Sequence, residues 1–322
     1  MDSTLGLLWQ PCRGGARILR VYGDSPVPVV PAALDGVPVA EIGAYCFADR
    51  RPANDPTFRF WSSDGSPREE VSHEVTGNFV RQVTLPGTVS VLNNGAFYNC
   101  RQLEELRIGR GASAALGLGS DLFTNCRQLR RFVLDAAPDA PTGLIRLVGA
   151  VSADIEAVFA PDGEPQAALF FPEYSELLDE NTPAHIFNHS IEGIGYRYRQ
   201  CFEGGVLRPE EYDAAFDQAT VGESPSTLCR IAMDRLRYPF ALRLESRDRY
   251  TAQLRAHPDE AAAPILGQRD TEALRLLCSL LDLPARRRTA LACSAAGWSE
   301  GAALALEGTA RRRPKTYDFD DL

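Results

Sequence analysis

Alternating apolar and polar residues in three short segments predict half-buried strands. Every second residue is apolar in Gln82-Val83-Thr84-Leu85, in Glu105-Leu106-Arg107-Ile108 and in Arg131-Phe132-Val133-Leu134. A strand with this pattern turns one set of side chains toward a core and the other toward solvent. Pro86 follows the first segment, and because proline has no N–H it would end the ladder there.

A sequence repeat accompanies these strands. The run Asn99-Cys100-Arg101-Gln102-Leu103 returns 26 residues later as Asn125-Cys126-Arg127-Gln128-Leu129. A third copy lies 50 residues upstream, where Ile42, Gly43 and Phe47 match Leu92, Asn93 and Phe97. One coil of this length cannot bury its apolar face alone, so the equivalent Leu and Phe residues are expected to stack from coil to coil.

The spacing between the first two copies is wider because of residues 51–73. This segment is rich in Pro, Asn, Asp, Ser and Gly. Such a composition is typical of a surface insertion. A degenerate coil is the alternative, because the extra length is about that of one repeat.

Residues 34–47 and 83–103 resemble the first coil and a full repeat of BspA-like leucine-rich-repeat proteins. The resemblance covers about residues 30–135. It implies a short right-handed β-solenoid with a small sheet on one side. Members of this family bind diverse partners, and many are exported to the cell surface, so the resemblance implies binding without naming a ligand.

The sequence after the repeats predicts a cap and then a helical half. Residues 144–148 are expected to form a helix, and residues 155–159 and 168–171 a hairpin that caps the solenoid. Helical periodicity and start signals predict further helices at about 209–219, 225–238, 246–256, 259–267, 270–282, 285–296 and 299–310. The segments that begin at Asp270 and Trp298 resemble the second part of an ankyrin-type repeat.

These elements predict an α+β chain, in which a leucine-rich-repeat β-solenoid precedes an all-α stack of helical hairpins. The expected domains are 1–171 (repeats and capping hairpin), 172–205 (connector), 206–312 (helical, ankyrin-like) and 313–322 (disordered acidic tail). The tail carries two aromatic residues, and we hypothesise that it folds onto a partner.

The repeat cysteines Cys100 and Cys126 have two interpretations. A metal pair is one, but no paired C-x-x-C spacing accompanies them. We favour small buried residues stacked at a turn, with Asn99 and Asn125 bonded to turn backbone.

His185 and His189 are spaced four residues apart. On a helix this spacing puts both imidazoles on one face, as in a metal-dependent hydrolase. We favour two histidines in a polar connector, and we predict neither a metal nor another cofactor.

Tyr196, Arg197, Tyr198 and Arg199 are the candidate binding residues, because Tyr and Arg are enriched at interaction hot spots. Alternation would put the two tyrosines on one face and the two arginines on the other. The alternative is that the tyrosines are packed and the arginines are paired with nearby acids.

The net charge of −9 disfavours nucleic-acid binding. The N-terminus carries no secretory signal, and no run of 18 apolar residues predicts a membrane span. Eight cysteines are then expected to be reduced thiols in a cytoplasmic protein. The short basic clusters 286–288 and 311–313 are expected to be solvated helix faces.

The sequence therefore predicts a non-enzymatic intracellular scaffold or adaptor that binds another protein. One alternative is a metal-dependent hydrolase that uses His185 and His189. The other is a surface adhesin-like protein.

Overall fold

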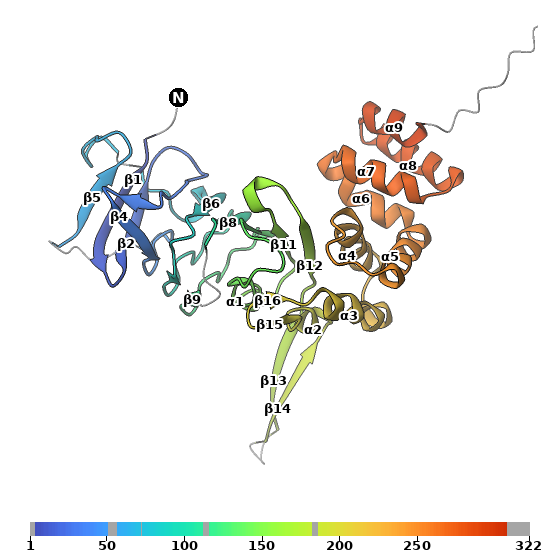
Figure 1. Ribbon diagram of the computed structural model, residues 1–322, viewed down its shortest axis with the longest axis horizontal. Coiled ribbons are helices and arrows are strands. Elements are labelled where there is room, and N and C mark those ends of the chain that lie inside the picture. The colour runs from blue at the N-terminus through green and yellow to red at the C-terminus, as the bar shows by residue number, and fades with distance from the viewer. Residues whose placement is uncertain (1–3, 51–56, 72, 112–115, 182–185, 308–322) are drawn as a thin grey trace, which may run out of the picture. The chain divides into compact units, whose positions relative to one another are not determined.

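The computed structural model describes residues 4–50, 57–71, 73–111, 116–181 and 186–307 (Figure 1). The chain divides into two compact units. The first comprises Met1–Glu223 with Tyr238–Arg243, and the second comprises Ser224–Arg237 with Leu244–Leu322.

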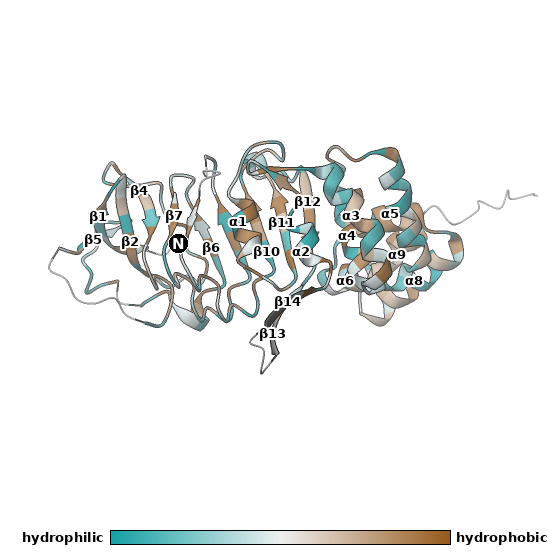
Figure 2. Cartoon of the chain, turned by 90° about the horizontal axis from the view of Figure 1, so that it is seen from below, coloured by the Kyte–Doolittle hydropathy of each residue, from teal (hydrophilic) through white to brown (hydrophobic). Residues whose placement is uncertain are grey.

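The first unit contains the three strands that alternation predicts, with the same bounds. Strands β6 (Gln82–Leu85), β8 (Glu105–Ile108) and β10 (Arg131–Leu134) are parallel and pair in register, with Val83 opposite Leu106 and Leu106 opposite Phe132. Strand β11 (Ile155–Phe159) continues the parallel sheet, and β12 (Ala167–Phe171) closes it as an antiparallel strand after a 3-10 turn (Pro161–Gly163). The predicted capping hairpin is therefore confirmed, and Figure 2 shows how apolar these last strands are.

A second sheet runs along the same three coils. Strands β4 (Val37–Ile42), β7 (Val91–Leu92) and β9 (Gly117–Leu118) are parallel. Ile42 pairs with Leu92, and Leu92 pairs with Leu118, which confirms the alignment of the three repeat copies. These two parallel ladders make the repeat region a β-solenoid.

Stacked phenylalanines fill the core between the two sheets. The ring centroids of Phe47 and Phe97 are 5.0 Å apart, and those of Phe97 and Phe123 are 5.6 Å apart. Each ring comes from the equivalent position of a successive coil, and all three are buried. The core is thus built by repetition along the solenoid.

An N-terminal hairpin, which the sequence pattern did not predict, covers the first coil. Strands β1 (Gly6–Cys12) and β2 (Gly15–Tyr22) are antiparallel, and β2 pairs with β4, which also pairs with the two-residue β3 (Ala33–Leu34). The buried Arg20 of β2 donates to the carbonyl oxygens of Ala48, at 2.5 Å, and Arg50. It therefore fastens the hairpin to the end of the first coil.

The insertion contributes a strand rather than a coil. Strand β5 (Arg59–Ser62) pairs with β1 at the edge of the sheet, and Phe60 packs against a buried cluster of Leu8, Leu19, Tyr22 and Val71. A short 3-10 turn (Gly77–Phe79) then leads into β6. The described part of the segment is an insertion, as predicted, but part of it is packed and not a surface loop.

The segment expected to be a connector contains regular elements. Before this segment, the helix predicted at 144–148 is confirmed as α1 (Leu144–Gly149), and β11 and β12 follow α1 in the chain. Strands β13 (Ser175–Asn181) and β14 (Ile186–Glu192) then form an antiparallel hairpin. Helix α2 (Gly195–Tyr198), the short strands β15 (Phe202–Glu203) and β16 (Val206–Leu207), and helix α3 (Pro209–Gly222) complete the first unit, which also includes residues 238–243.

The second unit is helical, as predicted. Its helices are α4 (Pro225–Arg237), α5 (Leu244–Ala256), α6 (Pro258–Gln268), α7 (Thr271–Leu280), α8 (Leu283–Ala295) and α9 (Ser299–Leu306). Capping side chains set several of the starts, because the Ser224 Oγ accepts the Thr227 N–H at 3.1 Å and the Asp282 carboxylate accepts the Ala285 N–H at 2.9 Å. Arg286, which was expected on a solvated face, instead donates to the Ala305 carbonyl oxygen at 2.9 Å.

Candidate protein-binding surface

Helix α2 carries the four candidate binding residues and separates them into two pairs. Tyr196 and Arg197 are exposed, whereas Tyr198 and Arg199 are buried. The predicted alternation is wrong because this segment is a single helical turn. Successive residues of a helix lie about 100° apart, so Tyr196 and Tyr198 do not share a face.

Arg199 binds backbone and does not serve as a contact residue. It is 3% exposed and donates to five carbonyl oxygens at 2.5 to 3.0 Å, those of Val148, Val151, Ala153, Pro172 and Gly195. Its guanidinium also lies 4.9 Å from the centroid of the Tyr174 ring. Burial lowers the pKa of Arg199 to about 10. The prediction that it pairs with acids is wrong, because all five of these acceptors are backbone oxygens at the chain turns that it holds together.

Tyr198 anchors α2 to α3. Its ring centroid lies 4.6 Å from that of Tyr212, whose hydroxyl donates to the Phe170 carbonyl oxygen of β12 at 2.5 Å. Burial raises the pKa of Tyr198 well above its usual value. Tyr198 is therefore a core residue, as the packed alternative expected.

The exposed pair, Tyr196 and Arg197, lies at the base of the β13–β14 hairpin. The Tyr196 ring contacts that of Tyr174 edge to face, with centroids 5.6 Å apart. Leu177, Ile191 and Tyr196 are 46%, 38% and 39% exposed. We call Tyr174, Leu177, Ile191, Tyr196 and Arg197 the hairpin surface.

The register of the hairpin distributes these side chains over both of its faces. Ile191 pairs with Glu176, and Tyr174 precedes Glu176 by two residues, so Tyr174 and Ile191 share a face. Leu177 lies on the opposite face. The hairpin is a two-stranded sheet that projects from the first unit (Figure 1), so each strand has one edge whose N–H and C=O groups are not used within that sheet. The sequence pattern did not predict this hairpin, because its residues show no strong alternation.

The histidine pair does not have the expected arrangement. His189 lies on strand β14 and not on a helix, so the helical-face interpretation is wrong for it. His185 lies outside the described residues. Within the part of the chain that the structure describes, no group of three or more His, Cys, Asp or Glu side chains is placed to hold a metal ion.

The repeat cysteines form a ladder between coils. The Cys100 Sγ donates to the Phe47 carbonyl oxygen at 3.2 Å, and the Cys126 Sγ donates to the Phe97 carbonyl oxygen at 3.0 Å. The Asn125 amide nitrogen donates to the Asn99 amide oxygen at 2.8 Å. These asparagines were expected to bond to turn backbone, and the Asn99 N–H does donate to the Thr124 carbonyl oxygen at 2.9 Å, whereas the two side-chain amides bond to each other.

Two solved structures of leucine-rich-repeat proteins align with part of this chain. A leucine-rich cell surface protein from Faecalibacterium prausnitzii aligns with 40% of this chain and 31% of its own, at 17% identity and a TM-score of 0.26. A leucine-rich-repeat protein from T. pallidum aligns with 40% of this chain and 68% of its own, at 19% identity and a TM-score of 0.22. This chain thus matches less than a third of the length of the first structure.

No protein-family model matches the chain, and no curated protein matches it. Among the helices of the described residues, none has both the length and the apolar composition needed to cross a membrane.

Proposed function

We propose that this protein is a non-enzymatic interaction module that binds another protein through the hairpin surface. The observation that carries this proposal is a projecting two-stranded ribbon with exposed Leu177 and Ile191 beside Tyr196. An isolated two-stranded hairpin is marginally stable in water, and open strand edges bind further strands. A partner that covers the ribbon would stabilise it and be held by it.

The energetics favour protein as the ligand. Covering a Leu or Ile side chain completely contributes about 2 kcal/mol, and Leu177 and Ile191 begin 46% and 38% exposed, so each would contribute roughly 1 kcal/mol. Tyr196 and Arg197 add the residue types that are enriched at hot spots. Backbone pairing along an open edge would supply hydrogen bonds and register.

The thiols support binding over nucleophilic catalysis. Burial raises the pKa of Cys46, Cys126 and Cys201 to about 12 and that of Cys229 to about 11. Since the thiolate is the nucleophile, these groups are unreactive near neutral pH.

We place this function inside the cell, as a cytoplasmic scaffold or adaptor. All eight cysteines are free thiols, which is typical of proteins from reducing compartments. Fractionation of source cells tests the placement, and recovery of the protein at the cell surface would favour the adhesin-like alternative. Stoichiometric zinc or manganese that is lost in His189→Ala would favour the hydrolase alternative.

A capture experiment tests the hairpin surface itself. The double variant Leu177→Asp with Ile191→Asp places charge on both faces of the ribbon. Val221→Asp is the matched control, because Val221 of α3 is 89% exposed in the same unit. We expect quantitative mass spectrometry to show a partner that the wild type and Val221→Asp retain and that the double variant loses at least about tenfold. Equal capture by all three proteins, with unchanged melting curves, would contradict the proposal.

A further inference from the structure

The turns of the three coils are joined by a backbone ladder of constant direction. From the first coil to the second, the Tyr45 N–H donates to the Asn94 carbonyl oxygen at 3.1 Å and the Phe47 N–H donates to that of Ala96 at 2.8 Å. From the second coil to the third, the same relationship joins Gly95 to Ser120 (2.8 Å), Phe97 to Leu122 (3.2 Å) and Asn99 to Thr124 (2.9 Å). Each coil therefore donates N–H groups at alternate residues to the carbonyls of the coil that follows.

The ladder stops at the third coil with its donors unused. By position, the next donors are the N–H groups of Asp121, Phe123 and Asn125. Within the described residues, none of these three N–H groups has a hydrogen-bond partner. The next coil, which carries β11, has α1 in place of a turn of this kind. Among the described residues, nothing therefore accepts these three donors.

A pocket lies beside the third turn. Its volume is about 610 Å³, and it is lined by residues of the third turn, including Asp121, Phe123 and Asn125, and by residues 150–153 that follow α1. We call it the coil-end pocket. Asn125 uses its amide nitrogen toward Asn99, so its amide oxygen is the acceptor that the amide of a further turn would meet.

We propose that the coil-end pocket binds an extended peptide segment of a partner protein, which adds to the solenoid as a fourth turn. The chemistry of the occupant follows from the carbonyl acceptors and the aromatic ring that each turn already presents to the turn before it. The third turn offers carbonyl oxygens at Ser120, Leu122 and Thr124, with an aromatic ring at Phe123 stacked on Phe97. A ligand segment therefore needs three alternate carbonyls, with a Phe between the second and third.

Continuity with an existing interface supports this assignment. The contact between coils occurs twice within this chain, with the same hydrogen-bond direction and the same phenylalanine stacking. The coil-end pocket presents the backbone part of that contact a third time, at N–H groups that a β-type ligand pairs with through its main chain. The Phe123 ring beside these groups is 8% exposed. This site is separate from the hairpin surface and does not depend on the function proposed for it.

A peptide copied from the third turn is the direct probe. Its sequence is Gly-Ser-Asp-Leu-Phe-Thr-Asn-Ser, which is residues 119–126 with the last residue changed to Ser. We expect saturable one-to-one binding to the full chain by fluorescence anisotropy, and binding at least about tenfold weaker when the peptide Phe is replaced by Ala. Absence of saturable binding up to about 1 mM, or equal binding of the Ala peptide, would overturn the proposal.

Two protein variants locate the binding. Ser152→Trp fills the pocket from an exposed position, and Ser226→Trp makes the same change at an exposed residue of α4. We expect the first to weaken peptide binding at least about tenfold and the second to leave it unchanged. If a folded Ser152→Trp protein binds the peptide as tightly as the wild type does, the site is wrong. If this variant does not fold, the peptide with Ala in place of Phe, measured on wild-type protein, still tests the proposal.

A matched pair separates the pocket from the stability of the coil. Asn125→Gly and Asn99→Gly both remove the same amide–amide hydrogen bond, and glycine tolerates the positive φ of 63° and 62° at these positions. Only Asn125 lines the coil-end pocket. We expect Asn125→Gly alone to weaken peptide binding, by roughly fivefold, and equal effects of the two variants would overturn the proposal.

Two further experiments test whether another part of this chain, or a second copy of it, occupies the coil-end pocket. If deletion of residues 314–322 raises peptide affinity more than about tenfold, the chain's own tail competes for the pocket. If the peptide dissociates a dimer in analytical ultracentrifugation, a second copy fills it. Either result would overturn the assignment to a partner protein.

Discussion

The Cys126 thiol donates a hydrogen bond to the Phe97 carbonyl oxygen of the preceding coil at 3.0 Å. Cys100 makes the same contact with Phe47 one coil earlier. Burial raises the pKa of Cys126 to about 12 and that of Cys100 well above its usual value. These thiols are therefore protonated donors that join successive turns, in parallel with the phenylalanine stack.

This ladder predicts an order of cysteine reactivity. At pH 8 only about one Cys126 thiol in ten thousand is ionised at a pKa of about 12, whereas Cys12 is only partly buried. We expect iodoacetamide to modify Cys12 at least about tenfold faster than Cys100 or Cys126, as measured by peptide mass spectrometry. In denaturant all eight should react at similar rates, and fast labelling of Cys100 in the native protein would contradict the ladder.

We expect substitution of Arg199 to lower the stability of the first unit strongly. Arg199→Met keeps the length of the side chain but removes the side-chain donor to five carbonyl oxygens. We expect the free energy of unfolding of the first unit to fall by about 3 kcal/mol or more, with Arg199→Lys intermediate because an ammonium has three donors. Arg197→Met, at the exposed neighbour, should change it by less than about 0.5 kcal/mol. Urea denaturation measures both, and equal effects would refute the structural role.

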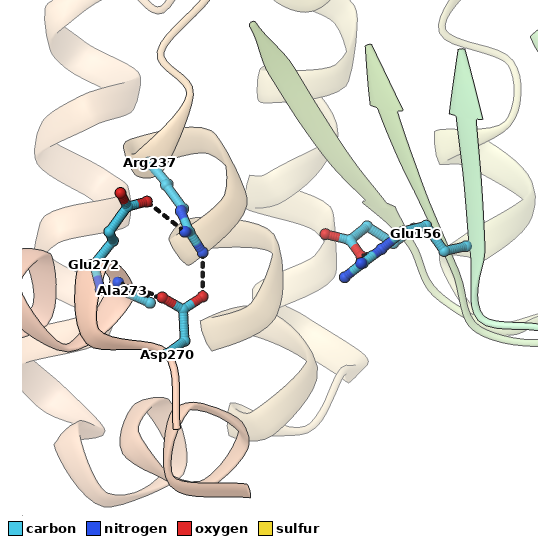
Figure 3. A network of polar contacts seen from close by, with 6 residues as sticks. Glu156, Arg237, Asp270, Glu272 and Ala273 are labelled. Carbon is cyan, nitrogen blue, oxygen red and sulfur yellow. Dashed lines mark hydrogen bonds and ion pairs between the residues drawn. The ribbon is translucent and has the colours of Figure 1, made fainter. Parts of the chain in front are cut away.

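Asp270 predicts a pH-dependent contribution in the second unit. Burial by itself would raise the pKa of Asp270, but the Ala273 and Glu272 N–H donors and the Arg237 guanidinium outweigh it and hold the pKa below its usual value of 3.8 (Figure 3). A lowered folded pKa stabilises the protein above the unfolded pKa, and that stability is lost as the pH falls through the folded value.

The matching variant is Asp270→Asn, because Asn also caps a helix and the change removes mainly the charge. We expect the wild type to be more stable than this variant from neutral pH down to about pH 4, and the difference to shrink at lower pH. Thermal melts of the two proteins across this range measure it. A difference that is independent of pH would show that the charge of Asp270 contributes nothing.

Gly87 lies where the backbones of two coils approach each other closely. A Cβ at Gly87 would lie 1.6 Å from the Arg110 carbonyl oxygen. Gly87→Ala should therefore lower the free energy of unfolding by about 2 to 3 kcal/mol. Gly149→Ala, at the end of α1 with no heavy atom within 4 Å of the added Cβ, should raise it by about 0.5 kcal/mol. Chemical denaturation of both variants distinguishes backbone contact from a general effect of glycine replacement.

The sequence alone determined the features that repeat or that depend on neighbours along the chain. The bounds of β6, β8 and β10 follow from alternation, the pairing of Ile42 with Leu92 follows from the repeat, and the starts of α3 and α4 follow from proline and serine signals. In each case the physical cause is local, or is the same contact copied from coil to coil.

Only the tertiary structure decided the features that depend on residues far apart in the sequence. The sequence pattern predicted Arg199 to be a binding residue. It is buried because carbonyl oxygens from residues 148–153 and Pro172 converge on its guanidinium. The N-terminal hairpin and β5 form because they complete a sheet whose other strands come from the repeats. The unused donors at Asp121, Phe123 and Asn125 exist because the coil that follows, which carries β11, has α1 in place of a turn like the three before it.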